Sequence, residues 1–354
     1  MDNRELAMQF GLVLGYWGTA PEKGLALTLE AEQLGFDAVW VAEAYGTDAF
    51  TPLAWLAAQT KNILLGTAVV QIPARTPAMT AMTATTLDML SNGRVLLGIG
   101  VSGPQVVEGW HGVPYGKPLV RTREFVTIFR EMVARKGPVE FKGKDYRLPY
   151  DGPDASGLGR PLKLIHHPLR ASIPIYLGAM GPKNVALAAE IADGWFPHML
   201  SPFHYQKLFR EHLEAGFARA GSGKSVENFD IIAQVYVTVG DDLDACRMAE
   251  KRRLGLILGG YGAKTKNLYI EAASRYGYGT ACQQIQELYL SGRKEEAVLA
   301  VPDELVDELT LVGPRAHVAK QLEAWKKSGI TRIAAWTDQP EALRMLADLS
   351  TPAA

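Results

Sequence analysis

This chain of 354 residues has few cysteines, no excess of positive or negative charge, and no long apolar runs. Its two cysteines, Cys246 and Cys282, are too few for a disulfide framework or a cysteine metal cluster. Because 37 basic residues nearly balance 38 acidic ones, nothing favours nucleic acid or an anionic membrane surface as a partner. No stretch reaches the roughly 20 apolar residues that a membrane span requires.

Several functional motifs are missing as well. Residues 1–12 lack the basic region and apolar run of a signal peptide, so we expect a cytoplasmic protein. There is no G-x-S-x-G elbow, no P-loop and no cysteine–histidine pair with an orienting partner. The seven histidines show no metal-binding spacing, so we expect no metal. A bound cofactor that carries the chemistry is therefore favoured over a covalent nucleophile.

One local pattern recurs along the chain: a helix, a glycine, one or two residues, and then an apolar strand. Gly35, Gly93, Gly194 and Gly329 each stand where a left-handed residue would end the helix. The strands that follow are continuous apolar runs, which is typical of strands buried on both faces.

Eight such strands with intervening helices predict an α/β protein with a (β/α)8 TIM barrel. We expect a single domain over 1–354, with insertions at about 101–172 and 250–312, after strands four and seven. Loops that follow the strands meet at the catalytic face of such a barrel, so the residues after each strand matter most. The expected strands are Phe10–Leu14, Ala38–Val41, Ile63–Val69, Val95–Ile99, Ile173–Leu177, Gly194–Phe196, Ile231–Val237 and Arg332–Trp336.

The fifth expected strand ends in a turn that resembles an anion site. The turn Gly178-Ala179-Met180-Gly181-Pro182-Lys183 leads directly into a helix. The first backbone N–H groups of a helix have no intrahelical partner, and they carry the positive end of its dipole. Lys183 would add a mobile positive charge. A phosphorylated cofactor and an ordinary structural turn are both consistent with this composition.

The other strand ends offer ring contacts. Gly15, Tyr16 and Trp17 follow strand one, where the two aromatic residues would wall a flat ring or simply cap the barrel. Val101, Ser102 and Gly103 follow strand four and form a turn with free backbone donors, which suits a planar heterocycle or any tight turn.

Two residues at strand ends are candidates for proton transfer. Glu43 follows strand two and would pair with a cation or take part in acid–base chemistry. His198 follows strand six, and its unperturbed pKa suits a proton carrier, although a lone histidine is also common as a structural residue. His166 and His167 lie in the loop that enters strand five, so we expect them on the far rim or in the insertion.

These residues together resemble a known family. The segments LGYWG (14–18), LLGTAVVQIPARTP (64–77), SNGRVLLGIGVSGPQVVEGW (91–110) and GGYGAKTKN (259–267) are similar to the luciferase-like flavin and deazaflavin oxidoreductases. So are residues 35–57 and 173–197, and the similarity spans essentially the whole chain. Within this family, the chain most resembles the actinobacterial branch of coenzyme F420-dependent oxidoreductases.

The resemblance implies a cofactor ring across the C-terminal mouth of the barrel and a phosphate at the turn after strand five. It also implies a non-proline cis peptide at Ala68–Val69, with Val70 beyond it. Homodimers formed through helices of the barrel are a further implication. Where sugar-phosphate dehydrogenases of the family carry an Asp-His pair and a later acid, this chain has Glu43-Ala44 and Gly103-Pro104. These departures argue against glucose-6-phosphate oxidation, and Ala44 argues against light emission.

Three functions follow from the resemblance. The first is hydride transfer between F420 and a small organic substrate, in a pocket of Tyr16, Trp17, Glu43, Val70 and His198. The second is an FMN-dependent monooxygenase supplied with reduced flavin by a partner reductase. The third is a cofactor-binding protein without catalysis. Basic residues for the F420 tail would favour the first, and Lys183, Lys264 and Lys266 are candidates.

Overall fold

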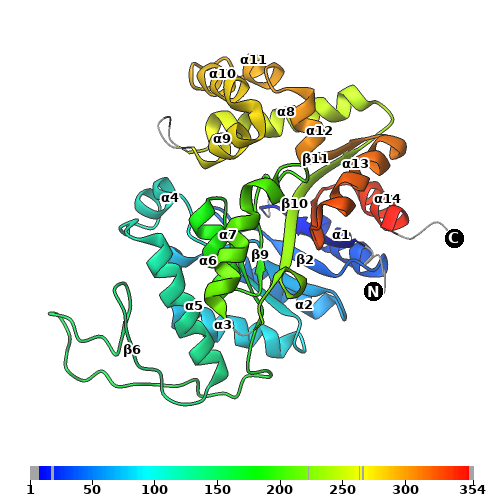
Figure 1. Ribbon diagram of the computed structural model, residues 1–354. Helices are drawn as coiled ribbons and strands as arrows, with labels where there is room; N and C mark the ends of the chain where they lie inside the picture. The colour runs from blue at the N-terminus through cyan, green and yellow to red at the C-terminus, as the bar shows by residue number, and fades with distance from the viewer. Residues whose placement is uncertain (1–7, 17–19, 222, 263, 265–266, 351–354) are drawn as a thin grey trace.

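Eight parallel strands close into a barrel at the centre of the molecule (Figure 1). The computed structural model describes residues 8–16, 20–221, 223–262, 264 and 267–350. The last barrel strand pairs with the first, which closes the ring and confirms the predicted (β/α)8 fold. In order around the barrel, the strands are β1 (Gln9–Leu14), β2 (Ala38–Val41), β3 (Leu64–Thr67), β5 (Val95–Gly100), β8 (Ile175–Gly178), β9 (Gly194–Trp195), β10 (Asp230–Val239) and β12 (Arg332–Trp336).

Helices pack around the outside of this barrel because each presents an apolar stripe to the strands. In the last-but-one helix, for example, Val318, Leu322 and Trp325 are all buried at the predicted spacing. The surrounding helices are α1 (Pro21–Gln33), α2 (Phe50–Gln59), α3 (Pro77–Leu90), α5 (Pro118–Ala134), α6 (Pro182–Ile191), α7 (Tyr205–Ala220), α13 (Arg315–Ser328) and α14 (Pro340–Ser350). None of the helices in the described ranges is long and apolar enough to cross a membrane.

Three of the four predicted glycine turns are present. Gly35, Gly93 and Gly329 have φ of 80°, 82° and 87°, a backbone conformation that favours glycine. The prediction was wrong for Gly194, which is the first residue of β9. A Cβ on Gly194 would lie 2.5 Å from the ring of Tyr176, so this glycine is required by close packing and not by a helix end.

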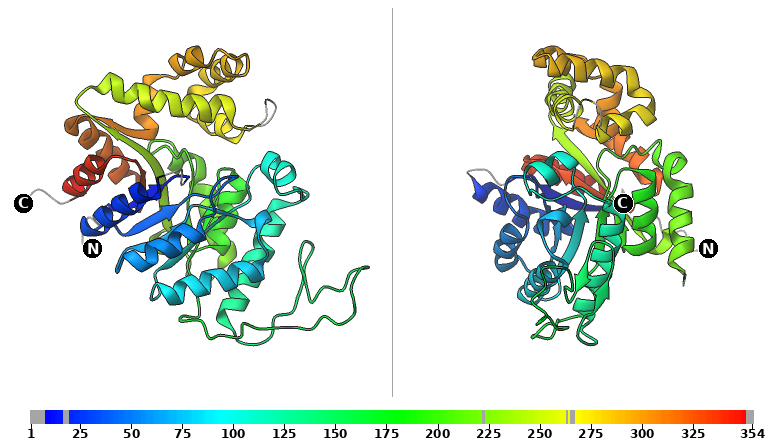
Figure 2. Two further views of the ribbon diagram at one scale, coloured as in Figure 1. Left: turned by 180° about the vertical axis from the view of Figure 1, so that it is seen from behind. Right: turned by 90° about the vertical axis from the view of Figure 1, so that its left-hand side faces the viewer.

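The first predicted insertion is a long arm that projects from the N-terminal end of the barrel (Figures 1 and 2). We define the arm as residues 136–172, between α5 and β8; it contains the short antiparallel pair β6 (Phe141–Lys142) and β7 (Arg147–Leu148). The Glu124 carboxylate of α5 accepts hydrogen bonds from three backbone N–H groups of the arm, at residues 144–146. His166 lies in the arm, as expected, and contacts Thr85 of α3.

The second insertion forms a helical cap at the opposite end of the molecule (Figure 2). Strand β10 is long enough to leave the barrel, and its outer half pairs with an additional strand, β11 (Thr310–Gly313), which the sequence analysis did not predict. The helices of the cap, residues 243–309, are α8 (Leu243–Gly260), α9 (Leu268–Ala273), the π-helical turn η3 (Ser274–Tyr278), α10 (Gly279–Leu290), α11 (Lys294–Leu299) and α12 (Asp303–Leu309).

Candidate active site

At the C-terminal end of the barrel, the side chains that point inward form two successive layers of different composition. Val13, Trp40, Ile232 and Ala334 are buried together inside the barrel. Because side chains of a strand alternate between its two faces, the residues two positions later also point inward and form the next layer. On one side this layer consists of small residues, Gly15, Ala42, Ala68, Gly100 and Gly178, and on the other of large ones, His198, Gln234 and Trp336.

The loop after β3 narrows the small side of this layer. The peptide between Ala68 and Val69 is cis, at the position that the resemblance implied. A Cβ on Gly100 would lie 2.6 Å from Cγ2 of Val69, and one on Gly178 would lie 3.4 Å from the same atom. Val70 follows in the short strand β4 (Val70–Gln71), where it is buried. The Val69 methyl groups therefore lie over both glycines; a side chain at position 100 would not fit beneath them, whereas a Cβ at position 178 would only be in van der Waals contact.

The loop after β5 adds backbone donors beside this side of the mouth. Val101, Ser102 and Gly103 are partly exposed between β5 and the short helix α4 (Pro104–Gly109). Ser102 has a φ of 58°, which is uncommon for a residue with a side chain. Sequence reasoning placed all three residues at the mouth, and the structure does so as well.

The turn after β8 has the form expected of an anion site. Gly181 is the N-cap of α6, with Pro182 at the first helical position and Lys183 exposed beside it. Val185 N donates to Gly181 O as the first helical bond, so the N–H groups of Lys183 and Asn184 precede the helical ladder, and Pro182 has none. A Cβ built on Gly181 meets no heavy atom within 4 Å, so the space beside the Cα of this N-cap residue is open.

The cap supplies a second cation to this turn, which sequence reasoning missed. Arg275 of η3 donates from Nη1 to the Met180 carbonyl oxygen at 3.2 Å, and its other Nη lies 3.8 Å from the Glu271 carboxylate. Ala179, one residue earlier, is buried and its carbonyl accepts from Trp195 Nε1 at 2.8 Å. Contact between segments about 95 residues apart gives no signal in a single sequence.

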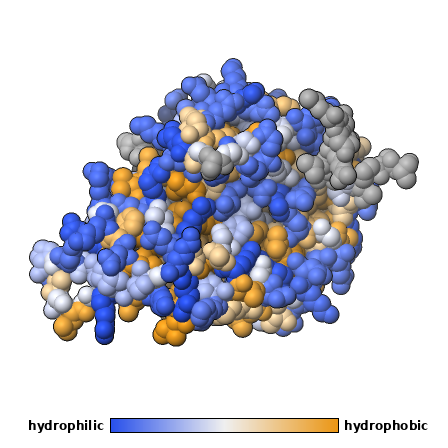
Figure 3. Space-filling model, turned by 60° about the horizontal axis from the view of Figure 1, so that its bottom comes forward, coloured by the Kyte–Doolittle hydropathy of each residue, from blue (hydrophilic) through white to orange (hydrophobic). Residues whose placement is uncertain are grey.

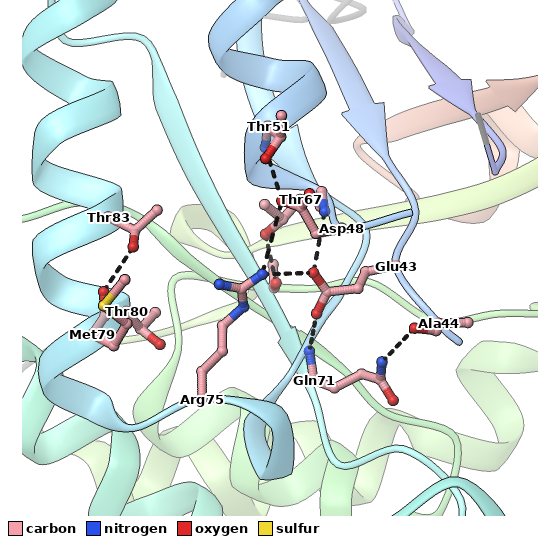
Figure 4. Close-up of polar contacts among 12 residues, drawn as sticks. Glu43, Ala44, Asp48, Thr51, Thr67, Gln71, Arg75, Met79, Thr80 and Thr83 are labelled. Atoms are coloured by element: carbon pink, nitrogen blue, oxygen red, sulfur yellow. Dashed lines mark hydrogen bonds and ion pairs between the residues drawn. The ribbon is translucent and has the colours of Figure 1, made fainter. Parts of the chain in front are cut away.

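Glu43 lies at the mouth, but three donors occupy its carboxylate (Figure 4). It accepts from the backbone N–H of Ala49 and Gln71, both at 3.1 Å, and pairs with Arg75 Nη2 at 3.0 Å. Its side chain is 5% exposed. These contacts tie the loop after β2 to β4 and to the segment that follows it, so the geometry gives Glu43 a role in holding the loop that carries Val69 and Val70.

His198 lies between β10 and the cap. Its Nε2 is 3.1 Å from the Tyr236 hydroxyl, and its ring meets the ring of Tyr269 edge-on at 5.4 Å. Burial lowers the pKa of His198 to about 4, so the imidazole is neutral near pH 7. Its Nδ1 is buried and has no hydrogen-bond partner in the described part of the chain.

Tyrosines line the remaining rim. Tyr16 lies two residues after β1 and is 52% exposed; partial desolvation, together with the nearby Tyr261, Tyr269 and Tyr45, raises its pKa to about 12. Tyr261 and Tyr269 belong to the cap, with ring centroids 5.8 Å apart. Thus phenol groups from the barrel and the cap gather at one opening. Trp17 and Lys266, both predicted site residues, lie outside the described residues.

The residues present fit a planar cofactor with a phosphate tail. On the small side of the mouth, the Val69 methyl groups pack over Gly100, and the N-terminus of α6 offers backbone donors for an anion. Within the ranges that the structure describes, no group of three histidine, cysteine, aspartate or glutamate side chains could hold a metal ion. The predicted acid–base candidates, Glu43 and His198, are few, which suits chemistry carried by the cofactor.

Comparison with known proteins places this site in a family. Residues 8–332 match the model of the luciferase-like monooxygenases. The chain is 49% identical over 346 residues, 98% of its length and 99% of the other, to a Mycobacterium tuberculosis protein provisionally named a coenzyme F420-dependent oxidoreductase. It is 31% identical to the 5,10-methylenetetrahydromethanopterin reductase of Archaeoglobus fulgidus, over 86% of both chains. The F420-dependent tetrahydromethanopterin reductase of Methanopyrus kandleri has a similar fold, with a TM-score of 0.81 at 24% identity over 96% of this chain and 97% of the other.

Proposed function

The chain belongs to the luciferase-like monooxygenase family and is an oxidoreductase, and from this premise we propose that it uses coenzyme F420 to exchange a hydride with a small organic molecule. The observation that carries the proposal is the N-terminus of α6 beside a mouth whose inner residues are small on one side. The provisional name of the relative that is 49% identical supports the choice of F420 over FMN.

Each part of the mouth has a task in this proposal. The α6 N-terminus, Lys183 and Arg275 would hold the phosphate, and Val69, Gly100 and Gly178 would support the ring. When bound, the deazaflavin supplies the hydride and reacts poorly with oxygen. The chain then has to position the substrate, exclude water and deliver one proton. Of the two predicted candidates, His198 would serve this last role, because three donors hold the Glu43 carboxylate.

Binding is the direct test of this proposal. F420 titrated into the protein should quench or shift its fluorescence with saturation at micromolar concentrations. FMN should bind more weakly, and reduced FMN should cause no oxygen consumption above that of free flavin. Failure of F420 to bind, together with oxygen consumption on addition of reduced FMN, would instead assign the FMN-dependent monooxygenase reaction. Binding of F420 without turnover of any substrate in a broad panel would assign a cofactor carrier.

We also propose that the protein forms a homodimer through α3 and the arm. Met82 and Leu90 on the outer face of α3 are 50% and 69% exposed, and Ile165 of the arm is 97% exposed. The contacts of His166 and Arg170 with α3 hold this part of the arm against the helix. Figure 3 shows apolar side chains in patches among charged ones at this end of the molecule. Apolar groups concentrated in this way are typical of a surface that another chain covers.

A further inference from the structure

Two large aromatic side chains are exposed together on the barrel side of the mouth. Tyr45 lies in the loop after β2 and is 61% exposed, and Trp110 directly follows α4 and is 66% exposed. Their ring centroids are 6.3 Å apart. Tyr16 lies beside the same loop, because a Cβ on Gly46 would be 3.7 Å from the Tyr16 ring. Exposed apolar groups that gather in this way are typical of a surface that binds another molecule.

The cap contributes two further rings to the same opening. Tyr261 directly follows α8, Tyr269 lies in α9, and both are partly exposed. Burial, and after it the neighbouring Tyr45, raises the pKa of Tyr261. Burial, followed by Tyr261 and Tyr45, raises the pKa of Tyr269. The phenol of Tyr45 therefore lies near both phenols of the cap. We define the aromatic collar as the residues that surround this opening: Tyr16, Tyr45, Trp110, Tyr261 and Tyr269.

The phenol hydroxyls of the aromatic collar are free to bind a ligand. In the described part of the chain, none of the four hydroxyls has a hydrogen-bond partner, and none is a buried polar atom. Tyr16 and Tyr45 are more than half exposed, so a ligand can reach them directly. With its pKa raised to about 12, Tyr16 stays protonated near pH 7, and its hydroxyl can both donate and accept a hydrogen bond.

The two kinds of group in the aromatic collar select different parts of a ligand. The phenol and indole rings attract a flat aromatic system, which stacks on them or meets them edge-on, whereas a saturated ring makes apolar contact alone. The hydroxyls pair with oxygen atoms that donate or accept hydrogen bonds. Because rings from both the barrel and the cap border the opening, a ligand of fused rings contacts more of the collar than a single ring does.

We propose that the aromatic collar binds the non-reacting part of the substrate, and that this part is a fused aromatic ring system with oxygen substituents. The inference rests on the proposed function, because it names the substrate class for the same mouth. Tyr45 and Trp110 are its specificity-determining residues. Both lie in loops outside the inner layer of the barrel, so they select the substrate without taking part in hydride or proton transfer.

The test is isothermal titration calorimetry of the F420-loaded protein with 2-naphthol, a fused aromatic ring system that carries a hydroxyl. Decahydro-2-naphthol has the same carbon skeleton and hydroxyl without the aromatic rings, and it should bind roughly three- to tenfold more weakly. Trp110→Ala should weaken 2-naphthol binding by a similar factor, and Tyr45→Phe, which loses only a hydroxyl, by roughly two- to fivefold. Tyr150→Ala is the matched control, because Tyr150 is a similarly exposed tyrosine on the arm, at 57%, and its loss should leave the affinity unchanged.

Equal affinities for the two ligands, or unchanged 2-naphthol binding in Trp110→Ala or Tyr45→Phe, would overturn the inference, as would an equal loss in Tyr150→Ala. F420 binding is measured separately on the same protein by fluorescence. Failure of F420 to bind refutes the proposed function, while 2-naphthol titrated into the unloaded protein still decides whether the aromatic collar binds such rings. F420 binding without 2-naphthol binding refutes the inference alone.

Discussion

Replacing Glu43 should destabilise the protein instead of merely slowing a proton transfer. In Glu43→Ala, the N–H groups of Ala49 and Gln71 and the Arg75 guanidinium lose their shared partner (Figure 4). Breaking a buried ion pair typically costs roughly 3–5 kcal/mol, and unpaired buried N–H groups contribute to such losses. We therefore expect Glu43→Ala to lower the free energy of unfolding by about 3–5 kcal/mol. Glu43→Gln, which keeps one carbonyl acceptor, should cost about 1–3 kcal/mol.

Equilibrium urea unfolding followed by tryptophan fluorescence measures this loss. Glu323→Ala is a suitable control, because Glu323 is an exposed carboxylate whose pairing with Lys326 is at the surface, and it should unfold as the wild type does. F420 affinity should fall in both Glu43 variants, since the loop carrying Val69 and Val70 loses its attachment. If Glu43→Ala unfolds like the wild type and binds F420 normally but loses turnover, the reasoning is refuted and Glu43 is the proton donor.

Three further outcomes are expected. Arg275→Gln should weaken F420 binding roughly three- to tenfold, and the difference should shrink in high salt because the lost interaction with the phosphate is electrostatic. Equal affinities in fluorescence titration would contradict this expectation. Met82→Glu should convert a dimer into a monomer in light scattering, whereas persistence of the dimer would place the interface elsewhere. Hydrogen bonds from Arg123, and then Arg219, lower the pKa of Glu190 to about 2. Its stabilisation should therefore be full above about pH 4.5, lost as the pH falls to about 2, and absent from the acid-unfolding curve of Glu190→Gln.

The barrel was predictable because its signals are local. Apolar runs, helical stripes and the turns at Gly35, Gly93 and Gly329 each involve a few neighbouring residues, and they placed all eight barrel strands. The glycine turn that leads into α6 was predictable for the same reason, whereas its role as an anion site stays a prediction. The role of Gly194 was not predictable, because a glycine required by a ring from another strand has the same local sequence pattern as a glycine that ends a helix.

The contacts of Arg275 and Glu43 at the site were not predictable, because they join segments far apart in the sequence. Arg275 reaches Met180 from the cap, and the donors that surround Glu43 come from two later segments, so neither arrangement has a local pattern. One local signal was present but not used: in β10, Gln234, Tyr236 and Thr238 alternate with apolar residues, and the expected strand ended at Val237. A period of two at the end of that strand indicates a face with a different environment.

The central claim, that the phosphate of a cofactor sits on the N-terminus of α6, is tested most directly by F420 binding to Gly181→Asp. Gly181 has a φ of −96° and open space around its Cβ position, so aspartate fits there. Aspartate is also a favoured N-cap, and stability should be kept or raised by up to about 1 kcal/mol. Its carboxylate would occupy the anion position, so we predict saturable F420 binding by the wild type and at least tenfold weaker binding by the variant. Equal affinity in a stably folded Gly181→Asp would contradict the account.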